Sequence, residues 1–204
     1  DYDRVEGVHY HRIDHALDEN FVVMMDLMCK AMVHRFHEVT GLVGAFDLVH
    51  AHDWLAANTL AYVRDGWGTP GILTMHSTEY GRDGNVFHDG MARWVRDTEA
   101  AGCHQARLII AVSAFLAAEL QRLYGVPHDR IHVVPNGVAY HQFDGFIDPG
   151  PVKGRYAIGP LDPTIFASGR MMAQKGMDLL VEAVPMVLAS YPSAKFVIAG
   201  EGPE

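Results

Sequence analysis

The chain has 204 residues, of which 49% are hydrophobic and 20% are charged, and its formal net charge is −9. This composition is ample for a packed core, and the negative balance argues against a general nucleic-acid-binding protein, which needs clustered cations. The two cysteines, Cys29 and Cys103, lie far apart without a CxxC motif, which fits a reducing, cytoplasmic compartment. The most apolar helical run, Phe21–Val33, contains Asp26 and Lys30, so we expect no transmembrane segment.

The first forty residues predict one strand and one long helix. The strand lies within Val5–Ile13, and the helix begins after a cap at Asn20 and ends at Gly41. Large apolar side chains recur along this helix at near-helical spacing, and we interpret them as core residues. They are Phe21, Met24, Met28, Met32 and Phe36.

Strands then alternate with helices as far as residue 140. The predicted strands are Phe46–His50, Gly71–Met75, Leu108–Val112 and Ile131–Val134. The predicted helices are Leu55–Val63 with Asp53 as its cap, Ala92–Ala101, and a segment that runs from a cap at Ser113 to Tyr124. Such alternation indicates an α/β fold with a doubly wound parallel sheet.

The alternation breaks over residues 141–163, a Gly/Pro/Asp-rich stretch that we interpret as an interdomain linker. We therefore predict an N-terminal Rossmann-like domain over residues 1–140 and the start of a second one over residues 164–204. A single strand–helix–strand unit has too little apolar surface to stand alone. Since the chain also lacks an initiator Met, we expect it to be a fragment of a longer protein, with the second domain truncated.

Polar residues follow four of the predicted strands directly. They are His52, His76, Asn136 and Arg170. In open parallel sheets, ligands bind at the edge formed by the carboxyl ends of the strands. Because these residues are spread over two predicted domains, they predict a cleft between the domains.

The segment Ile165–Gly176 offers the most specific chemistry. It comprises an apolar strand, a turn at Ser168-Gly169, the cations Arg170 and Lys175, and then a helical pattern. Cations before a helix N-terminus form a suitable seat for a diphosphate. The alternative is a surface loop with two solvated cations.

A second chemistry is possible at His50 and His52. Residues i and i+2 of a strand share a face, so both side chains could reach one metal ion in a hydrolase. The metallo-β-lactamase pattern would place Asp and His at positions 54 and 55, where this chain has Trp54 and Leu55.

Several motifs together resemble the GT-B retaining glycosyltransferases, with the glycogen and starch synthases and the family 4 glycosyltransferases as nearest relatives. The motifs occur in the family's order, from residue 50 to the end of the chain. They are His50-Ala-His-Asp-Trp54, His76-Ser-Thr-Glu-Tyr-Gly-Arg82, Ile110-Ala-Val-Ser113, Val134-Pro-Asn-Gly-Val138, Ser168-Gly-Arg-Met-Met-Ala-Gln-Lys-Gly176 and Val197-Ile-Ala-Gly-Glu-Gly-Pro203.

The resemblance implies transfer of a sugar from a nucleotide-diphosphate donor with retained anomeric configuration. Arg170 and Lys175 would neutralise the leaving diphosphate in place of a metal, because preorganised cations stabilise the charge that develops there. His52 would contact the donor sugar. The remaining donor-side residues would be Asn136, Gly137, Gly169, Gly200 and Gly202, and the acceptor-side residues His76, Glu79 and Tyr80.

The resemblance also sets expectations for ligands. The donor would be ADP-glucose or UDP-glucose, with no metal cofactor, and the acceptor a glucan or another glycosyl acceptor such as a lipid or small molecule. The family's Gly-rich loop and its pair of glutamates do not occur in these 204 residues, so we expect the chain alone to be inactive. A non-catalytic nucleotide-sugar-binding module remains an alternative.

Overall fold

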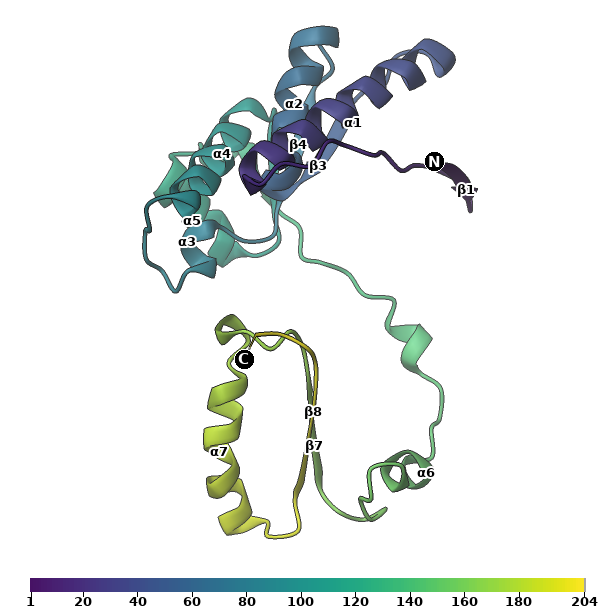
Figure 1. The fold of residues 1–204 in the computed structure, drawn as a ribbon, viewed down its shortest axis with the longest axis vertical. Coiled ribbons are helices and arrows are strands. Elements are labelled where there is room, and N and C mark those ends of the chain that lie inside the picture. Colours follow the sequence, from purple (N-terminus) through teal and green to yellow (C-terminus); the bar gives the residue numbers. More distant parts are fainter. Residues whose placement is uncertain (204) are drawn as a thin grey trace. The chain divides into compact units, whose positions relative to one another are not determined.

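The computed structural model describes residues 1–203 and divides into two compact units, one from Asp1 to Gly137 and one from Val138 onward (Figure 1). Each unit contains its own parallel sheet. Among the described residues, no helix is both long enough and apolar enough to cross a membrane.

The first unit begins with a β-hairpin and a long helix. Strands β1 (Tyr2–Val5) and β2 (Val8–His11) pair antiparallel, so a strand does lie within the predicted range Val5–Ile13, but the preceding strand β1 was not predicted. The two strands are joined by the turn at Glu6 and Gly7, whose positive φ angles of 51° and 84° reverse the chain.

Helix α1 spans Phe21–Val43. The predicted cap is confirmed, since the Asn20 side chain accepts hydrogen bonds from the backbone N–H groups of Val22 and Val23. The predicted end at Gly41 is wrong. The helix continues until Gly44, whose φ of 93° suits only a residue without a side chain.

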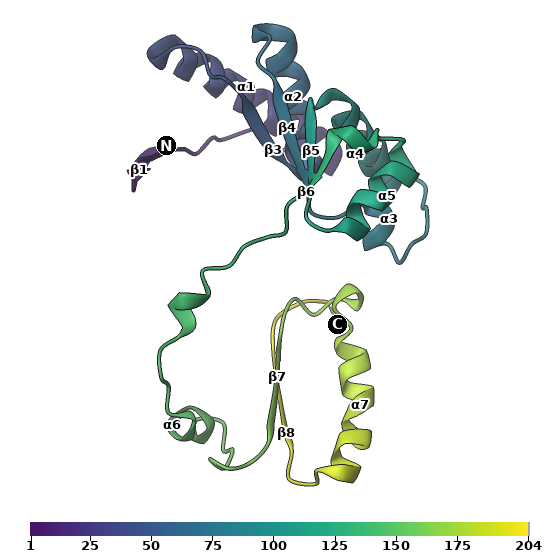
Figure 2. The ribbon, with the colours of Figure 1, turned by 180° about the vertical axis from the view of Figure 1, so that it is seen from behind.

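A four-stranded parallel sheet forms the centre of the first unit (Figure 2). Its strands, in spatial order, are β3 (Val49–His52), β4 (Gly71–Met75), β5 (Leu108–Ala111) and β6 (Ile131–Val133). The connecting helices are α2 (Asp53–Trp67), α3 (Glu79–Arg82), α4 (Met91–Gln105) and α5 (Ala114–Tyr124), and a short 3-10 helix, His128–Arg130, precedes β6.

One face of this sheet carries the core. Strand register places six buried residues on it: Ala51, Leu73, Met75, Ile109, Ala111 and Ile131. They pack with buried side chains of α2, α4 and α5 in one cluster. The opposite face is more exposed and carries His50 and His132. Helices α2 and α4 approach closely, since a Cβ on Gly102 would lie 2.6 Å from the Ala57 Cβ.

The beginning of β3 differs from the prediction. The strand starts at Val49 instead of Phe46 and continues through His52, which then caps α2. Asp53 is therefore not the cap. It is the first residue of α2 and has a left-handed φ of 56°.

The methionine stripe of α1 is only half-buried. Met24, Met28 and Met32 are partly accessible, and the buried residues of α1 are Val22 and Cys29. The Cys29 thiol donates to the Leu55 carbonyl. The stripe interpreted as core is therefore partly buried, and the fully buried residues of α1, Val22 and Cys29, each directly follow one of its members.

The second unit pairs β7 (Thr164–Ser168) with β8 (Lys195–Ala199) in parallel. Helix α7 (Met177–Ser190) joins the two strands, and α6 (Pro149–Gly154) precedes them. Short 3-10 helices occur at Tyr140–Phe143 and Ala173–Lys175. No residue of α7 is buried within the described chain, in contrast to the longer helices α1, α2, α4 and α5 of the first unit.

Candidate active site

Three histidines gather at the carboxyl ends of β3 and β4. His52 and His76 are joined by a 3.1 Å contact between Nδ1 of His52 and Nε2 of His76. The His50 ring stacks on the His52 ring with centroids 4.6 Å apart, and His52 stacks on His76 at 5.4 Å. The structure therefore brings together two of the residues predicted at this edge and adds His50 as a third.

Two further hydrogen bonds anchor this histidine stack. The hydroxyl of buried Thr74 lies 2.7 Å from Nε2 of His50, and the backbone N–H of His76 donates to Asp53 Oδ1 at 2.8 Å. Burial lowers the pKa of His50, and a charge on neighbouring His52 lowers it further. This environment thus favours the neutral imidazole of His50.

A buried carboxylate holds the loop after β4 in place. Glu99 on α4 is fully buried, and its oxygens accept from the backbone N–H of Glu79 at 2.9 and 3.1 Å and from Arg82 at 2.7 Å. The Tyr124 hydroxyl also donates to Glu99. Burial raises the pKa of Glu99, while these donors favour its charged form.

The side chain of Glu79 takes part in the same arrangement. Its Oε2 atom lies 2.6 Å from Arg82, which also donates to Ser77 at 2.8 Å. Tyr80 packs its ring on Phe87 at 4.7 Å. Two of the three predicted acceptor-side residues, Glu79 and Tyr80, are therefore engaged within the protein, and their roles toward an acceptor stay predictions.

A second buried carboxylate lies under the same loop. Glu119 on α5 accepts a hydrogen bond from the Thr78 hydroxyl, and Thr78 in turn caps α3 by accepting from the Gly81 N–H at 3.0 Å. Arg122 lies 3.9 Å from the other Glu119 oxygen.

Sequence reasoning missed both glutamates. The available signal was their position on apolar helix faces, since Glu99 shares its face with Val95 and Cys103 at helical spacing. A carboxylate is rarely buried without a partner, so such a position indicates a buried ion pair.

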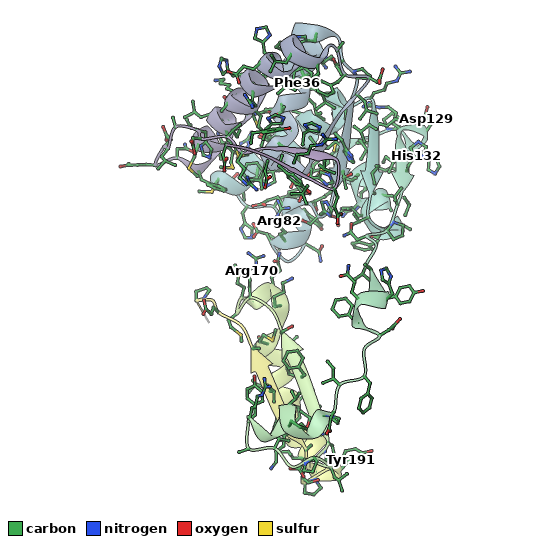
Figure 3. All side chains as sticks on the ribbon, turned by 90° about the vertical axis from the view of Figure 1, so that its right-hand side faces the viewer. Phe36, Arg82, Asp129, His132, Arg170 and Tyr191 are labelled. Atoms are coloured by element: carbon green, nitrogen blue, oxygen red, sulfur yellow. The ribbon has the colours of Figure 1, made fainter. Side chains whose placement is uncertain are left out.

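The loop after β7 carries the predicted diphosphate-binding cations. Arg170 (Figure 3) and Lys175 are both exposed. Among residues 1–203, neither makes an ion pair with a carboxylate. Lys175 is the last residue of the 3-10 helix. Gly176, which follows it with a φ of 62°, is the N-cap residue of α7. The two cations therefore precede a helix N-terminus, as the sequence predicts.

The glycines near this loop allow two segments of the backbone, the one after β7 and the one after β8, to pack closely together. A Cβ on Gly200 would lie 1.8 Å from the Gly169 carbonyl oxygen, and one on Gly202 would lie 2.0 Å from the Met171 carbonyl oxygen. Only glycine fits such an approach. The structure thus supplies a structural reason for Gly200 and Gly202, while contact with a nucleotide stays a prediction.

Asn136 and Gly137 end the first unit after β6, and both are exposed. A Cβ on Gly137 would meet no atom within 4 Å. Their part in a donor site, and the predicted cleft between domains, stay predictions.

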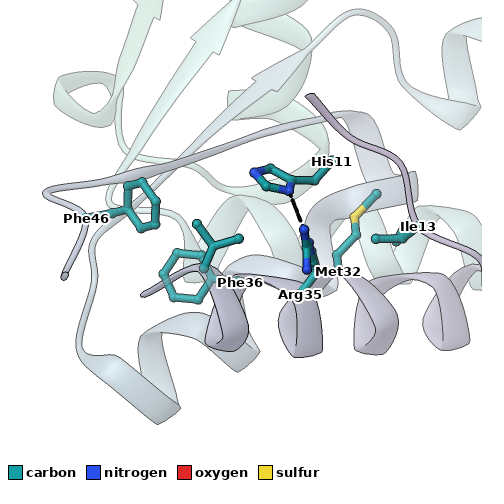
Figure 4. A pocket seen from close by; sticks show the side chains of 7 residues that line it. His11, Ile13, Met32, Arg35, Phe36 and Phe46 are labelled. Atoms are coloured by element: carbon teal, nitrogen blue, oxygen red, sulfur yellow. Dashed lines mark hydrogen bonds between the residues drawn. The ribbon is translucent and has the colours of Figure 1, made fainter. Parts of the chain in front are cut away.

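An open pocket of about 250 Å³ lies elsewhere in the first unit. It is lined by residues of β2, α1 and the segment before β3, and Figure 4 shows the hydrogen bond between His11 and Arg35 in its wall. Met32 and Phe36 of the methionine stripe line it. This cavity does not include the histidine stack.

The described residues contain no group of three or more His, Cys, Asp or Glu side chains that could hold a metal ion. In the hydrolase alternative, His50 and His52 would both serve as ligands. Here Nε2 of His50 is instead engaged by Thr74.

Comparison with solved structures defines the class of fold. The catalytic domain of starch synthase IV from Arabidopsis thaliana superposes with a TM-score of 0.71 at 14% identity, over 100% of this chain and 54% of that one. Sucrose-phosphate synthase from Thermosynechococcus elongatus gives 0.72 at 17% identity, over 96% and 47%. The predicted α/β fold of GT-B type is confirmed.

Sequence comparison defines the family. The model of Glycosyltransferase Family 4 matches residues 3–142, more than half of the chain, so the chain belongs to this family. An uncharacterized glycosyltransferase of Methanocaldococcus jannaschii is 28% identical over 207 residues, covering 99% of this chain and 52% of the relative. Glycogen synthase of Mycobacterium tuberculosis is 30% identical, covering 76% and 36%. The chain thus spans about half or less of the length of these relatives.

Proposed function

We propose that the whole protein transfers a sugar from a nucleotide-diphosphate sugar to an acceptor, with retained configuration and without a metal cofactor. The observation that carries this proposal is the loop after β7. Its two exposed cations, Arg170 and Lys175, have no carboxylate partner in the described chain and precede the N-terminus of α7.

The leaving group of such a transfer is a nucleoside diphosphate, which gains negative charge as the bond to the sugar breaks. Fixed cations and helix N–H groups stabilise that charge without having to reorganise. We propose that Arg170 and Lys175 fill the role that a divalent ion fills elsewhere, and that His52 hydrogen-bonds the donor sugar.

For the acceptor we propose a glucan. Support comes from the His50-Ala-His-Asp-Trp54 motif and from relatives named glycogen synthase. A second candidate is an inositol phosphate, because other relatives are named D-inositol 3-phosphate glycosyltransferase. We propose glucose as the sugar, and a related structure was solved in complex with UDP-glucose.

Lys175→Ala in the full-length protein tests the diphosphate role. Loss of one preorganised charge should raise the barrier by roughly 3 kcal/mol and lower kcat about a hundredfold. The measurement is release of nucleoside diphosphate from ADP-glucose and UDP-glucose, with glycogen or inositol 3-phosphate as acceptor.

Lys195→Ala is the matched control, because this exposed lysine lies at the opposite end of the β7–β8 pair. A folded Lys175→Ala variant with unchanged turnover would contradict the assignment. Turnover that is abolished by EDTA and restored by Mg²⁺ would contradict metal independence, and an inverted anomeric configuration in the product would contradict retention.

A further inference from the structure

Trp94 lies in the first turn of α4, and its side chain is largely exposed. Its exposed fraction is 57%, and that of Met91, three residues earlier, is also 57%. Within residues 1–203, the indole N–H of Trp94 has no hydrogen-bond partner and no other aromatic ring stacks on the indole. Because tryptophan is highly buried on average, this position is a candidate contact for a ligand.

An open pocket of about 430 Å³ lies against this indole, between the starts of α1 and α4. It combines apolar surface with two polar side chains. The Glu19 carboxylate is exposed and makes no ion pair within residues 1–203. The Asn20 Oδ1 atom caps α1, which leaves the amide N–H groups of Asn20 as donors. The lining residues are Glu19, Asn20, Val22, Gly90, Met91 and Trp94.

This pocket lies at the edge of the sheet that carries the candidate active site. Helix α1 leads into β3 and α4 leads into β5, and both strands belong to the parallel sheet. Each helix must therefore begin near the carboxyl ends of the strands. The Phe21 ring at the start of α1 also contacts the Trp54 ring edge-on, with centroids 5.8 Å apart, and Trp54 follows His52 by two residues.

The lining of the pocket suits a neutral sugar chain. The C–H face of a glucose ring packs on an indole, while its hydroxyls donate to a carboxylate and accept from amide N–H groups. Among the described residues that line the pocket, Glu19 alone is charged, and its negative charge disfavours a phosphorylated ligand. The backbone N–H groups of Val22 and Val23 already donate to Asn20, so they are not available to an anion.

We propose that the Trp94 pocket is a subsite for a glucan acceptor, in which a sugar unit away from the reacting end stacks on the indole. This inference rests on the proposed function for the identity of the acceptor, and it favours a glucan over an inositol phosphate. It adds a contact that the sequence motifs do not contain, since Trp94 lies outside all of them.

Tryptophan fluorescence of the full-length protein tests the site directly. Titration with maltoheptaose, a neutral glucan chain, should shift the emission to shorter wavelength, because the sugar excludes water from the indole. The shift should persist in the control Trp67→Phe, whose indole lies at the other end of α2, and vanish in Trp94→Phe. An emission that does not respond to millimolar maltoheptaose, or a shift of equal size in Trp94→Phe, would overturn the proposal.

Kinetics test the consequence for transfer. Trp94→Ala should raise KM for maltoheptaose about tenfold, as expected for loss of one good stacking contact, while KM for the donor changes less than about twofold. Trp94→Phe keeps a ring and should recover most of the affinity. KM for maltose, which is too short to reach the subsite from the reacting end, should rise less. An equal rise for both sugars, or a Trp94→Phe variant no better than Trp94→Ala, would overturn the stacking contact.

Inositol 3-phosphate serves as the charged probe. It should neither shift the emission of Trp94 nor compete with maltoheptaose, and a shift caused by this anion would overturn the preference for a neutral ligand. Failure of the proposed function is recognised separately. Binding of maltoheptaose at Trp94 without any transfer would refute the proposed function and leave the site, whereas transfer to maltoheptaose with a KM that Trp94→Ala does not change would refute the site alone.

Discussion

Two loops at the carboxyl ends of parallel strands are held in place by opposite means. The loop over residues 76–82, in the first unit, is held by side chains, since Glu99 and Glu119 accept from its backbone, Arg82 and Thr78. The loop over residues 169–176, in the second unit, is held by backbone hydrogen bonds. Gly169 N–H donates to Ala199 at 3.1 Å, and Met171 N–H donates to Glu201 at 2.9 Å.

The difference decides which side chains remain for a ligand. In the first unit, charged residues of the loop already form ion pairs within the protein, since Arg82 pairs with Glu79 and with Glu99. In the second unit, the loop is held by hydrogen bonds of its backbone, and Arg170 and Lys175 are exposed and make no ion pair with a carboxylate among residues 1–203. A loop that is held by its backbone can thus offer its full charge to a phosphate.

The largest effect on stability is expected from Glu99→Ala. Breaking a buried ion pair on one side costs about 3–5 kcal/mol, and this change also removes the acceptor of the Tyr124 hydroxyl and the Glu79 N–H. Urea denaturation followed by circular dichroism measures the loss. Asp97→Ala, which removes an exposed carboxylate from the same helix, should cost less than about 1 kcal/mol. Equal losses for the two variants would contradict the side-chain support of the first loop.

A smaller loss is expected from Gly200→Ala. The new methyl group would overlap the Gly169 carbonyl, and relieving it by a backbone shift should cost about 1–3 kcal/mol. Gly145→Ala is the control, because a Cβ there meets no atom within 4 Å. Both variants are compared by urea denaturation, and a Gly200→Ala protein as stable as the control would refute the close backbone approach.

The smallest effect on stability is expected from the double change Arg170→Ala and Lys175→Ala. Both side chains are exposed, and surface substitutions of this kind usually change stability by less than about 0.5 kcal/mol. Thermal unfolding of the variant should therefore match the wild type, whereas binding of a nucleoside diphosphate, measured by calorimetry, should be lost. A markedly lower melting temperature would show that these cations support the fold.

Much of the fold could be predicted because local signals and tertiary structure agree. The cap at Ser113 and the end at Tyr124 bound α5 as expected, since the Ser113 hydroxyl accepts from Leu116 N–H and Gly125, directly after Tyr124, adopts a left-handed conformation. The strand Gly71–Met75 was likewise predicted with its observed bounds.

The failures have two different causes, because a contact distant in sequence decides the role of Asp53, whereas a second glycine three residues further along decides the end of α1. Asp53 resembles a helix cap, but its carboxylate binds the N–H of His76, 23 residues away. Gly41 resembles a helix end, but the chain ends α1 only at Gly44. At the candidate site, order along the chain indicated that His52 and His76 lie at one edge, whereas their contact and the role of Glu99 depend on three-dimensional packing.

The two cysteines of the first unit can be used to measure how often its core opens. Cys29 and Cys103 are both buried and unpaired, and burial raises the pKa of Cys103 to about 12. Because only the thiolate reacts with alkylating reagents, neither thiol should be labelled while the core is closed. The rate of labelling in the native protein therefore measures how often this core opens, without any engineered probe.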